Sequence, residues 1–260
     1  MKRTLRTFSV RAFTLMEVLV VIGIIVLLMA VVIPVLSRAR ERARVSVCAS
    51  NLKQIGIGIA SYATDSVGER IPPFYNGLKD KDWFNFGWGW EPPYYGPWTT
   101  LVCEFSPGGM QGPINHAILY EKKYTLSPRV FYCPSATWRE WQYPSPDLWL
   151  KLPITGSISI FGSYNYNPHT SDTNMNNSFP KYHRRQDIPR NECLVIDNIL
   201  CWRKDNDISH KPNFGWNMAF SDGHVEFRSS PAALKLFVNA GPGVDQWSYI
   251  QPALALLESQ

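Results

Sequence analysis

An almost wholly apolar run, residues 13–35 (FTLMEVLVVIGIIVLLMAVVIPV), constrains this chain more than any other feature. A helix of this length, rising about 1.5 Å per residue, matches the roughly 30 Å hydrocarbon core of a bilayer. The run is flanked by the basic residues Lys2, Arg3, Arg6, Arg11, Arg38, Arg40, Arg42 and Arg44. A basic start followed by an apolar run is typical of an export segment. We therefore expect one membrane span, a cytoplasmic N-terminus and an extracytoplasmic remainder.

Glu17 is the one carboxylate inside this run and does not suit an ordinary anchor. A carboxylate at the centre of a bilayer costs roughly 2.5–3.5 kcal/mol, and less near the edge. Such a residue often marks a function or a partner. By itself, the position is explained equally well by an acid tolerated at the membrane edge. In a lone membrane helix we expect its charge to have few partners.

The residues around Glu17 distinguish these alternatives. Residues 11–17 (RAFTLME) closely resemble the cleavage and methylation motif of type IV prepilins and type II secretion pseudopilins. The resemblance implies that prepilin peptidase cuts between Ala12 and Phe13, that the new amine of Phe13 is methylated, and that Glu17 acts in assembly with other pilin-like subunits. It places the protein in the inner membrane or in a surface fibre. The chain departs from the family at Ala12, where Gly is usual, and this bears on cleavage efficiency.

The helical pattern continues beyond the membrane run. Pro34 removes one backbone donor, so we expect a kink there. The stripe that follows consists of Val35, Ala39, Ala43, Val47, Leu52, Ile55 and Ile59. Gly68 and the Ile-Pro-Pro of residues 71–73 end the pattern. The sequence therefore predicts one helix over residues 13 to about 63, apolar all round at first and amphipathic afterwards.

The chain is long enough to place more than 200 residues outside the membrane, which suffices for one large or two small domains. We divide it into a basic leader (1–12), a membrane and assembly helix (13–35), its amphipathic continuation (36–66) and an extracytoplasmic head (67–260). The predicted fold class is α+β, with the long N-terminal helix packed on a C-terminal antiparallel sheet. The resemblance makes this arrangement pilin-like.

Several shorter elements are expected in the head. Residues 222–223 (Asp-Gly) between two alternating runs predict a hairpin over residues 217–227. Residues 194–197 are a candidate buried strand, and the alternating tyrosines of residues 162–167 predict a half-exposed strand. The remaining expectations are a short helix at 114–123, a strand leading into a turn at 130–135, and a helix at 231–238 before an Ala/Leu-rich tail.

Four segments of the chain resemble a pseudopilin-like family of Planctomycetes, Verrucomicrobia and Lentisphaerae. They are residues 48–56 (CASNLKQIG), 130–135 (VFYCPS), 162–167 (GSYNYN) and 220–227 (FSDGHVEF). That family carries a C-terminal signature in which nine residues separate His from Asp-Gly. The matching positions here are Cys48, Asn51, Cys133, His210, Asp222 and Gly223. In this chain, however, eleven residues separate His210 from Asp222.

The five cysteines follow the membrane run, where export permits disulfides. They contain no Cys-x-x-Cys pair, which argues against a zinc ribbon or a thioredoxin-like motif. Cys48 and Cys133 lie in family-matching segments, so the resemblance implies a disulfide between them. A second candidate pair is Cys193 with Cys201, across an expected hairpin at residues 197–198. An odd number leaves one thiol unpaired within the chain.

The sequence offers no motif of a hydrolase, metalloprotease or nucleotide-binding loop, so we expect no enzyme and no cofactor. Much of the net charge of +5 lies in the leader and in residues 38–44, which indicates membrane topology rather than nucleic-acid binding. His210, Asp222 and His224 suggest a metal or catalytic cluster, but an Asp-Gly turn needs no such role. The carboxylates available to calcium are Asp197, Asp205 and Asp207, without EF-hand spacing.

Residues 74–100 are dense in aromatic residues, including WFNFGWGW at 83–90 and YYGPW at 94–98. Such rings either fill an irregular core, the commoner outcome, or stack on sugar rings. Three functions stay in view, and one of them, an exported enzyme, finds no catalytic constellation in the sequence. The first is a prepilin-like or pseudopilin structural subunit of a pilus-like or type II secretion-like complex. The alternative is a membrane-tethered binding module for a glycan or a secreted cargo that does not polymerise.

Overall fold

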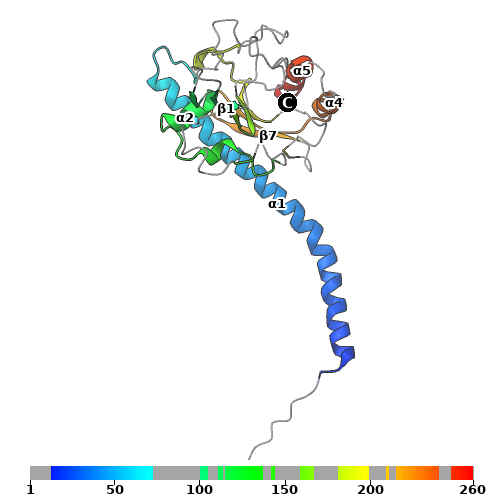
Figure 1. Ribbon diagram of the computed structural model, residues 1–260. Coiled ribbons are helices and arrows are strands. Elements are labelled where there is room, and N and C mark those ends of the chain that lie inside the picture. The colour runs from blue at the N-terminus through cyan, green and yellow to red at the C-terminus, as the bar shows by residue number, and fades with distance from the viewer. Residues whose placement is uncertain are drawn as a thin grey trace, which may run out of the picture. The chain divides into compact units, whose positions relative to one another are not determined.

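The computed structural model describes residues 13–72, 100–104, 111–113, 115–136, 142–143, 159–166, 181–198, 209–210, 215–239 and 247–259. The chain divides into two compact units, residues 1–42 and residues 43–260. The first unit consists of the N-terminal part of one long helix, α1. The second contains the rest of α1 and the other helices and strands, which Figure 1 labels.

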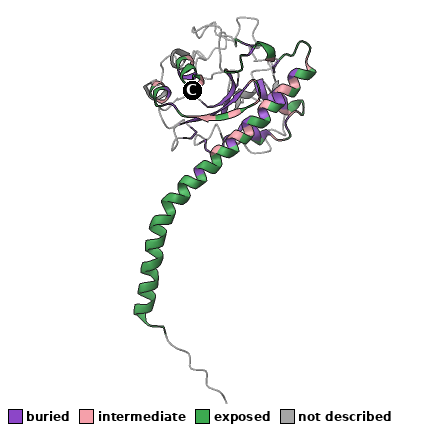
Figure 2. Ribbon diagram, turned by 180° about the vertical axis from the view of Figure 1, so that it is seen from behind, coloured by how far each residue is buried: buried purple, intermediate pink, exposed green. Residues whose placement is uncertain are grey.

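Helix α1 (Leu15–Asp65) runs without interruption through Pro34, which confirms the predicted long helix. Its first half is apolar all round, and the large side chains there are exposed, for example Leu15 at 82% and Leu27 at 70%. Figure 2 shows this part of the helix exposed on all sides. Among the described residues, α1 is the one helix long and apolar enough to cross a membrane.

The second half of α1 is amphipathic, as predicted. Its buried face consists of Cys48, Leu52, Ile55, Ile59 and Ala63. Their spacing of three or four residues places them on one side of a helix. Val47 and Ile57 lie on the opposite side and are about half exposed, at 50% and 55%. This half of α1 therefore contributes one apolar stripe to the core of the head.

A four-stranded antiparallel sheet forms the centre of the second unit. Its strands, in spatial order, are β4 (Tyr164–Tyr166), β5 (Cys193–Asp197), β6 (Trp216–Phe220) and β7 (Val225–Arg228). Every residue of β4, β5 and β6 is buried, so both faces of these strands are covered. A long N-terminal helix with a C-terminal antiparallel sheet confirms the α+β class. In Figures 1 and 2 the second half of α1 lies beside this sheet.

The predicted strand around Tyr164 exists, but its half-exposed character is wrong. Tyr164 and Tyr166 are both buried, and so is Asn165 between them. The Tyr166 hydroxyl donates a hydrogen bond to the Pro72 carbonyl at 2.6 Å. An alternating pattern predicts a half-exposed strand only when one face meets water, and here neither does.

The predicted hairpin is present as β6 and β7, with Trp216 opposite Arg228 and Ala219 opposite Val225. Gly223 at the turn has φ of +90°, a conformation that glycine adopts without steric cost. The Asp222 carboxylate accepts a hydrogen bond from the backbone N–H of His224 at 3.0 Å. The Asp-Gly pair therefore has a complete structural role in closing this turn.

The remaining elements surround this core. A second antiparallel sheet has the order β2-β1-β3, from β1 (Thr100–Glu104), β2 (Gln111–Pro113) and β3 (Ser159–Phe161). The predicted short helix is present as η2 (Asn115–Ala117) and α2 (Ile118–Glu121), and a further turn is η5 (Arg185–Asp187). The chain continues through α4 (Pro231–Asn239), as predicted, to α5 (Trp247–Glu258), where we expected only an apolar tail.

The strand expected at residues 130–133 is absent from this described segment. Its first residues belong instead to the 3-10 helix η3 (Pro128–Phe131). Ser127 caps this helix by accepting a hydrogen bond from the backbone N–H of Arg129 at 3.3 Å. Pro128 occupies the first position, where its missing N–H is not needed. A cap and a proline therefore outweigh the strand propensity of Val130 and Phe131.

Candidate functional site

The start of α1 holds the residues that the sequence assigns to processing and assembly. Ala12 lies outside the described residues, and Phe13 is exposed at 73%. Thr14 is the last residue before the helix, and both its backbone N–H and its hydroxyl donate to Glu17 Oε2 at 2.8 Å. The Glu17 N–H in turn donates to the Thr14 hydroxyl at 3.2 Å. This reciprocal pattern is a capping box.

The capping box corrects the expectation that Glu17 has few partners in a lone helix. Thr14 supplies two hydrogen-bond donors to its carboxylate. The pattern Thr-x-x-Glu before an apolar run is the sequence signal from which this cap could have been predicted. The carboxylate also lies near the positive end of the helix dipole, which favours its charge.

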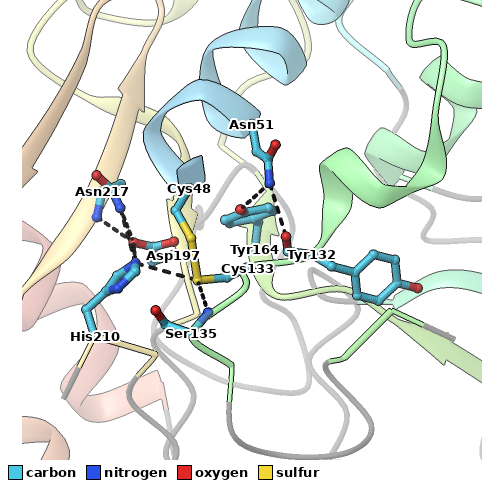
Figure 3. A network of polar contacts seen from close by, with 9 residues as sticks. All are labelled: Cys48, Asn51, Tyr132, Cys133, Ser135, Tyr164, Asp197, His210 and Asn217. Atoms are coloured by element: carbon cyan, nitrogen blue, oxygen red, sulfur yellow. Dashed lines mark hydrogen bonds and ion pairs between the residues drawn. A yellow bond between two sulfur atoms is a disulfide. The ribbon is translucent and has the colours of Figure 1, made fainter. Parts of the chain in front are cut away.

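A second group of residues gathers in the buried interior of the head, and Figure 3 shows it. Cys48 of α1 and Cys133, two residues after η3, form a disulfide with a Cα–Cα distance of 5.4 Å. This confirms the pairing that the resemblance implied. The bond joins two positions that are 85 residues apart, and it attaches α1 to the segment that follows η3.

The polar side chains beside this disulfide come from β5, β6 and residue 210. His210 Nε2 lies 3.2 Å from Asp197 Oδ2 and 3.5 Å from Cys133 Sγ. Asn217 donates to Asp197 Oδ2 from its backbone N–H at 2.7 Å and from its side chain at 2.9 Å. The side chains of Asp197 and His210 have no exposed surface. These contacts fix the positions of the carboxylate and the imidazole in the core.

Asn51 links α1 to the same region. Its side-chain amide donates to the Tyr132 carbonyl at 3.1 Å and to the Tyr164 hydroxyl at 3.3 Å. Burial, together with the negative charge of Asp197, raises the pKa of Tyr164 well above its ordinary value. The hydroxyl of Tyr164 is therefore a neutral hydrogen-bonding group.

The structure separates the residues of the predicted His210, Asp222 and His224 cluster. His210 belongs to the buried group, whereas Asp222 pairs with the ring of His224 on the partly exposed turn. Lys53 of α1 donates a hydrogen bond to the Gly223 carbonyl. Four signature positions therefore lie around the disulfide, and of the two at the turn, Gly223 contacts α1 through Lys53 while Asp222 stays within the turn.

Two residues of the buried group, Asp197 and Asn217, were not predicted as its members. Asp197 was considered only as a calcium ligand beside Asp205 and Asp207, which lie outside the described residues. The available sequence signal was the pair Asp197-Asn198 at the end of a strand predicted to be buried. Buried polar groups need partners, so this pair indicated a polar group in the core. Asn217 gave no comparable signal, since its role depends on the register between β5 and β6.

The predicted disulfide between Cys193 and Cys201 is wrong. Cys193 is a buried free thiol, and burial followed by the charge of Glu258 raises its pKa well above the ordinary value. Residues 197–198 do not form the expected hairpin, because β5 pairs with β4 and β6 instead. Cys201 lies outside the described residues, as do residues 74–99 of the aromatic segment.

Comparison with known proteins gives no further assignment. No protein-family model, curated protein or solved structure matches this chain. The chemistry of the two sites must therefore be argued from their own residues.

Proposed function

We propose that this chain is a prepilin-like or pseudopilin structural subunit. In this proposal, prepilin peptidase cleaves it between Ala12 and Phe13 and methylates Phe13, and the N-terminal helix then assembles with other pilin-like subunits. The observation that carries the proposal is the placement of Glu17 in the first turn of an apolar helix whose sides are all exposed. In a simple membrane tether, that carboxylate would serve only the helix cap.

The local structure suits cleavage at this position. Phe13 and Thr14 precede the first helical residue, Leu15, and Phe13 is exposed. A peptide bond outside the helix does not commit its N–H and C=O groups to the helical hydrogen-bond ladder. The capping box begins at Thr14, so removal of the preceding residues leaves the helix cap intact.

Glu17 is suited to select one arrangement of neighbouring helices. Apolar helices in lipid gain little from hydrophobic contact with each other, so packing and polar pairs decide their association. Both hydrogen bonds from Thr14 go to Oε2, so Oε1 is available to the charged amine of Phe13 on a neighbouring subunit. Such a pair forms only between neighbouring helices, so it favours one axial stagger.

Crosslinking between first helices tests the assembly step. A cysteine introduced at Val26 reports contact between adjacent subunits in the membrane. We expect Glu17→Val to abolish these crosslinks while leaving insertion, cleavage and folding of residues 45–260 intact. Glu17→Gln is the sharper variant, because glutamine preserves the capping box but removes the charge.

The two variants separate three outcomes. Loss of crosslinks in both variants supports the charge-pairing role. Crosslinks that survive in Glu17→Gln alone assign Glu17 to the helix cap and remove the charge pair from the proposal. If Glu17→Val also assembles like the parent, the membrane-tethered binding module becomes the better function.

Mass analysis of the mature N-terminus tests the processing step independently. We expect the chain to begin at a methylated Phe13. A chain beginning at Met1 or near Ser37 would contradict the proposal. Ala12→Gly restores the residue usual in the family and should increase the rate of cleavage in a pulse-chase comparison.

A further inference from the structure

We propose that Cys48, Cys133, Asp197 and His210 form a binding site for one zinc ion when the disulfide is reduced. The two sulfur atoms, one carboxylate oxygen of Asp197 and one imidazole nitrogen of His210 all lie within 4.8 Å of one another. The four side chains are buried and come from four separate segments of the chain. This site is independent of the N-terminal assembly motif.

The chemistry of the four ligands favours zinc over calcium. Two thiolates, an imidazole and a carboxylate are a tetrahedral ligand set of the kind that zinc accepts. Thiolate ligands are soft and select zinc or copper(I), whereas calcium requires six to eight oxygen ligands. The group assembled around Asp197 therefore differs in kind from the calcium site considered for residues 197, 205 and 207.

The surroundings of the four ligands also suit a bound cation. Asp197 Oδ1 is buried and has no hydrogen-bond partner among the described residues. A buried acceptor without a partner carries a desolvation cost that coordination would remove. The backbone N–H of Ser135 donates to Cys133 Sγ at 3.4 Å, and Asn217 donates twice to Asp197 Oδ2. Donors placed in this way orient metal ligands and stabilise their negative charge.

The disulfide and the metal site exclude each other, because both need the same two sulfur atoms. A dithiol or phosphine reductant breaks the S–S bond, supplying two electrons, and leaves two thiols while the reductant is oxidised. One Zn²⁺ then replaces the two thiol protons, which pass to solvent. Either state links α1 to the head, the oxidised one covalently and the reduced one through the metal. The redox state of the compartment therefore selects which link forms.

Cobalt titration of the full chain in detergent tests the proposal. The protein is reduced with a phosphine under anaerobic conditions, freed of metal and titrated with Co²⁺, which reports thiolate ligation by charge-transfer absorption. We expect one cobalt ion per chain, displacement by one equivalent of Zn²⁺, and no absorption from the oxidised protein. The proposal is overturned if the charge-transfer absorption of cobalt is the same before and after reduction, or if reduction produces none. This comparison uses the parent protein alone.

Variants then assign the ligands. The double substitution Cys48→Ser with Cys133→Ser should abolish the absorption, and Asp197→Asn or His210→Gln should weaken cobalt affinity at least about tenfold. Cys193→Ser is the matched control, because it removes a buried thiol outside the cluster, and His224→Gln removes a histidine from the turn. Absorption that persists in the double variant, or is lost in either control, contradicts the assignment.

A kinetic measurement complements the titration. In the reduced parent protein, one equivalent of Zn²⁺ should slow reformation of the Cys48–Cys133 disulfide by oxidised glutathione at least tenfold, as followed by peptide mapping. In Asp197→Asn the protection should be weaker. An unchanged rate in the parent would show that the two thiols do not hold zinc.

Discussion

The two halves of α1 belong to one continuous helix yet meet opposite surroundings. In the first half, large apolar side chains such as Leu27 and Val31 are exposed at 70% and 67%. In the second half, Leu52, Ile55 and Ile59 are fully buried. Helical geometry is the same in both, so the difference lies in where the apolar residues occur around the helix.

This difference shows what each half requires from its environment. An apolar stripe on one side is satisfied by a single partner, and the core of the head supplies it. An apolar surface on all sides is satisfied only by lipid or by several neighbouring helices. The head therefore folds around the second half, whereas the exposed apolar side chains of the first half suit lipid or neighbouring helices.

Removing the disulfide should cause the largest loss of stability in the head, because the disulfide attaches the second half of α1 and not the first. The double substitution Cys48→Ala with Cys133→Ala opens a link across 85 residues and should reduce the free energy of unfolding of the head by about 4–5 kcal/mol. Urea unfolding of the full chain in detergent measures this. Cys193→Ala, which removes a buried thiol without a crosslink, should cost about 1–2 kcal/mol. Equal losses would contradict the role of the crosslink.

Isoleucines on opposite sides of the helix test the buried stripe directly. Ile55→Ala deletes a fully buried side chain and should reduce the free energy of unfolding by about 2–4 kcal/mol. Ile57→Ala is the matched control, since Ile57 is exposed at 55%, and should change it by less than about 0.5 kcal/mol. Ile24→Ala in the first half should leave the unfolding of the head unchanged. Similar decreases in the free energy of unfolding for Ile55→Ala and Ile57→Ala would contradict the assignment of Ile55 to the buried face of α1.

Acid should reduce the free energy of unfolding of the head but should not affect the first half of α1. His116 is buried between Phe131 and Tyr166, and burial lowers its pKa to about 3 from an ordinary value of 6.5. Its ring nitrogens find no hydrogen-bond partner in the described part of the chain. As pH falls below about 6.5, the imidazole of His116 becomes protonated in the unfolded chain but stays neutral in the folded chain. The free energy of unfolding should therefore decrease by roughly 1 kcal/mol between pH 6 and pH 5.

The substitution His116→Phe checks this origin of the acid sensitivity. It should remove the decrease in the free energy of unfolding between pH 6 and pH 5 that His116 causes, because phenylalanine does not titrate. Urea unfolding curves at the two pH values measure this. A parent-like decrease in the His116→Phe protein would assign the acid sensitivity to other groups.

The smallest effect concerns two glycines in the second half of α1. A Cβ at Gly56 would meet no atom within 4 Å, so Gly56→Ala should stabilise the head by about 0.5–1 kcal/mol through helix propensity. A Cβ at Gly58 would lie 3.3 Å from side-chain atoms of Leu119 and Thr125, so Gly58→Ala should gain less. Thermal unfolding of both variants measures the difference, and a larger gain at Gly58 would be inconsistent with its contact to α2.

Local patterns predicted the elements whose structure depends on local rules. The period of apolar residues predicted α1, and the Asp222-Gly223 pair predicted the hairpin of β6 and β7. One error came where the surroundings overrode the pattern, and another where a stronger local signal did. Tyr164 is buried in a strand covered on both faces, and Ser127 with Pro128 starts a 3-10 helix in place of a strand.

The sequence by itself determined the extent of α1, its apolar and amphipathic halves, and the motif around Glu17, because these depend on residues within a few turns of one another. Tertiary structure alone brought Asp197, His210 and Asn217 to the Cys48–Cys133 disulfide. Their meeting depends on the pairing of β5 with β6 and on the packing of α1, which join segments up to 169 positions apart, from residue 48 to residue 217. No local period encodes such distances, since burial of the whole core selects them.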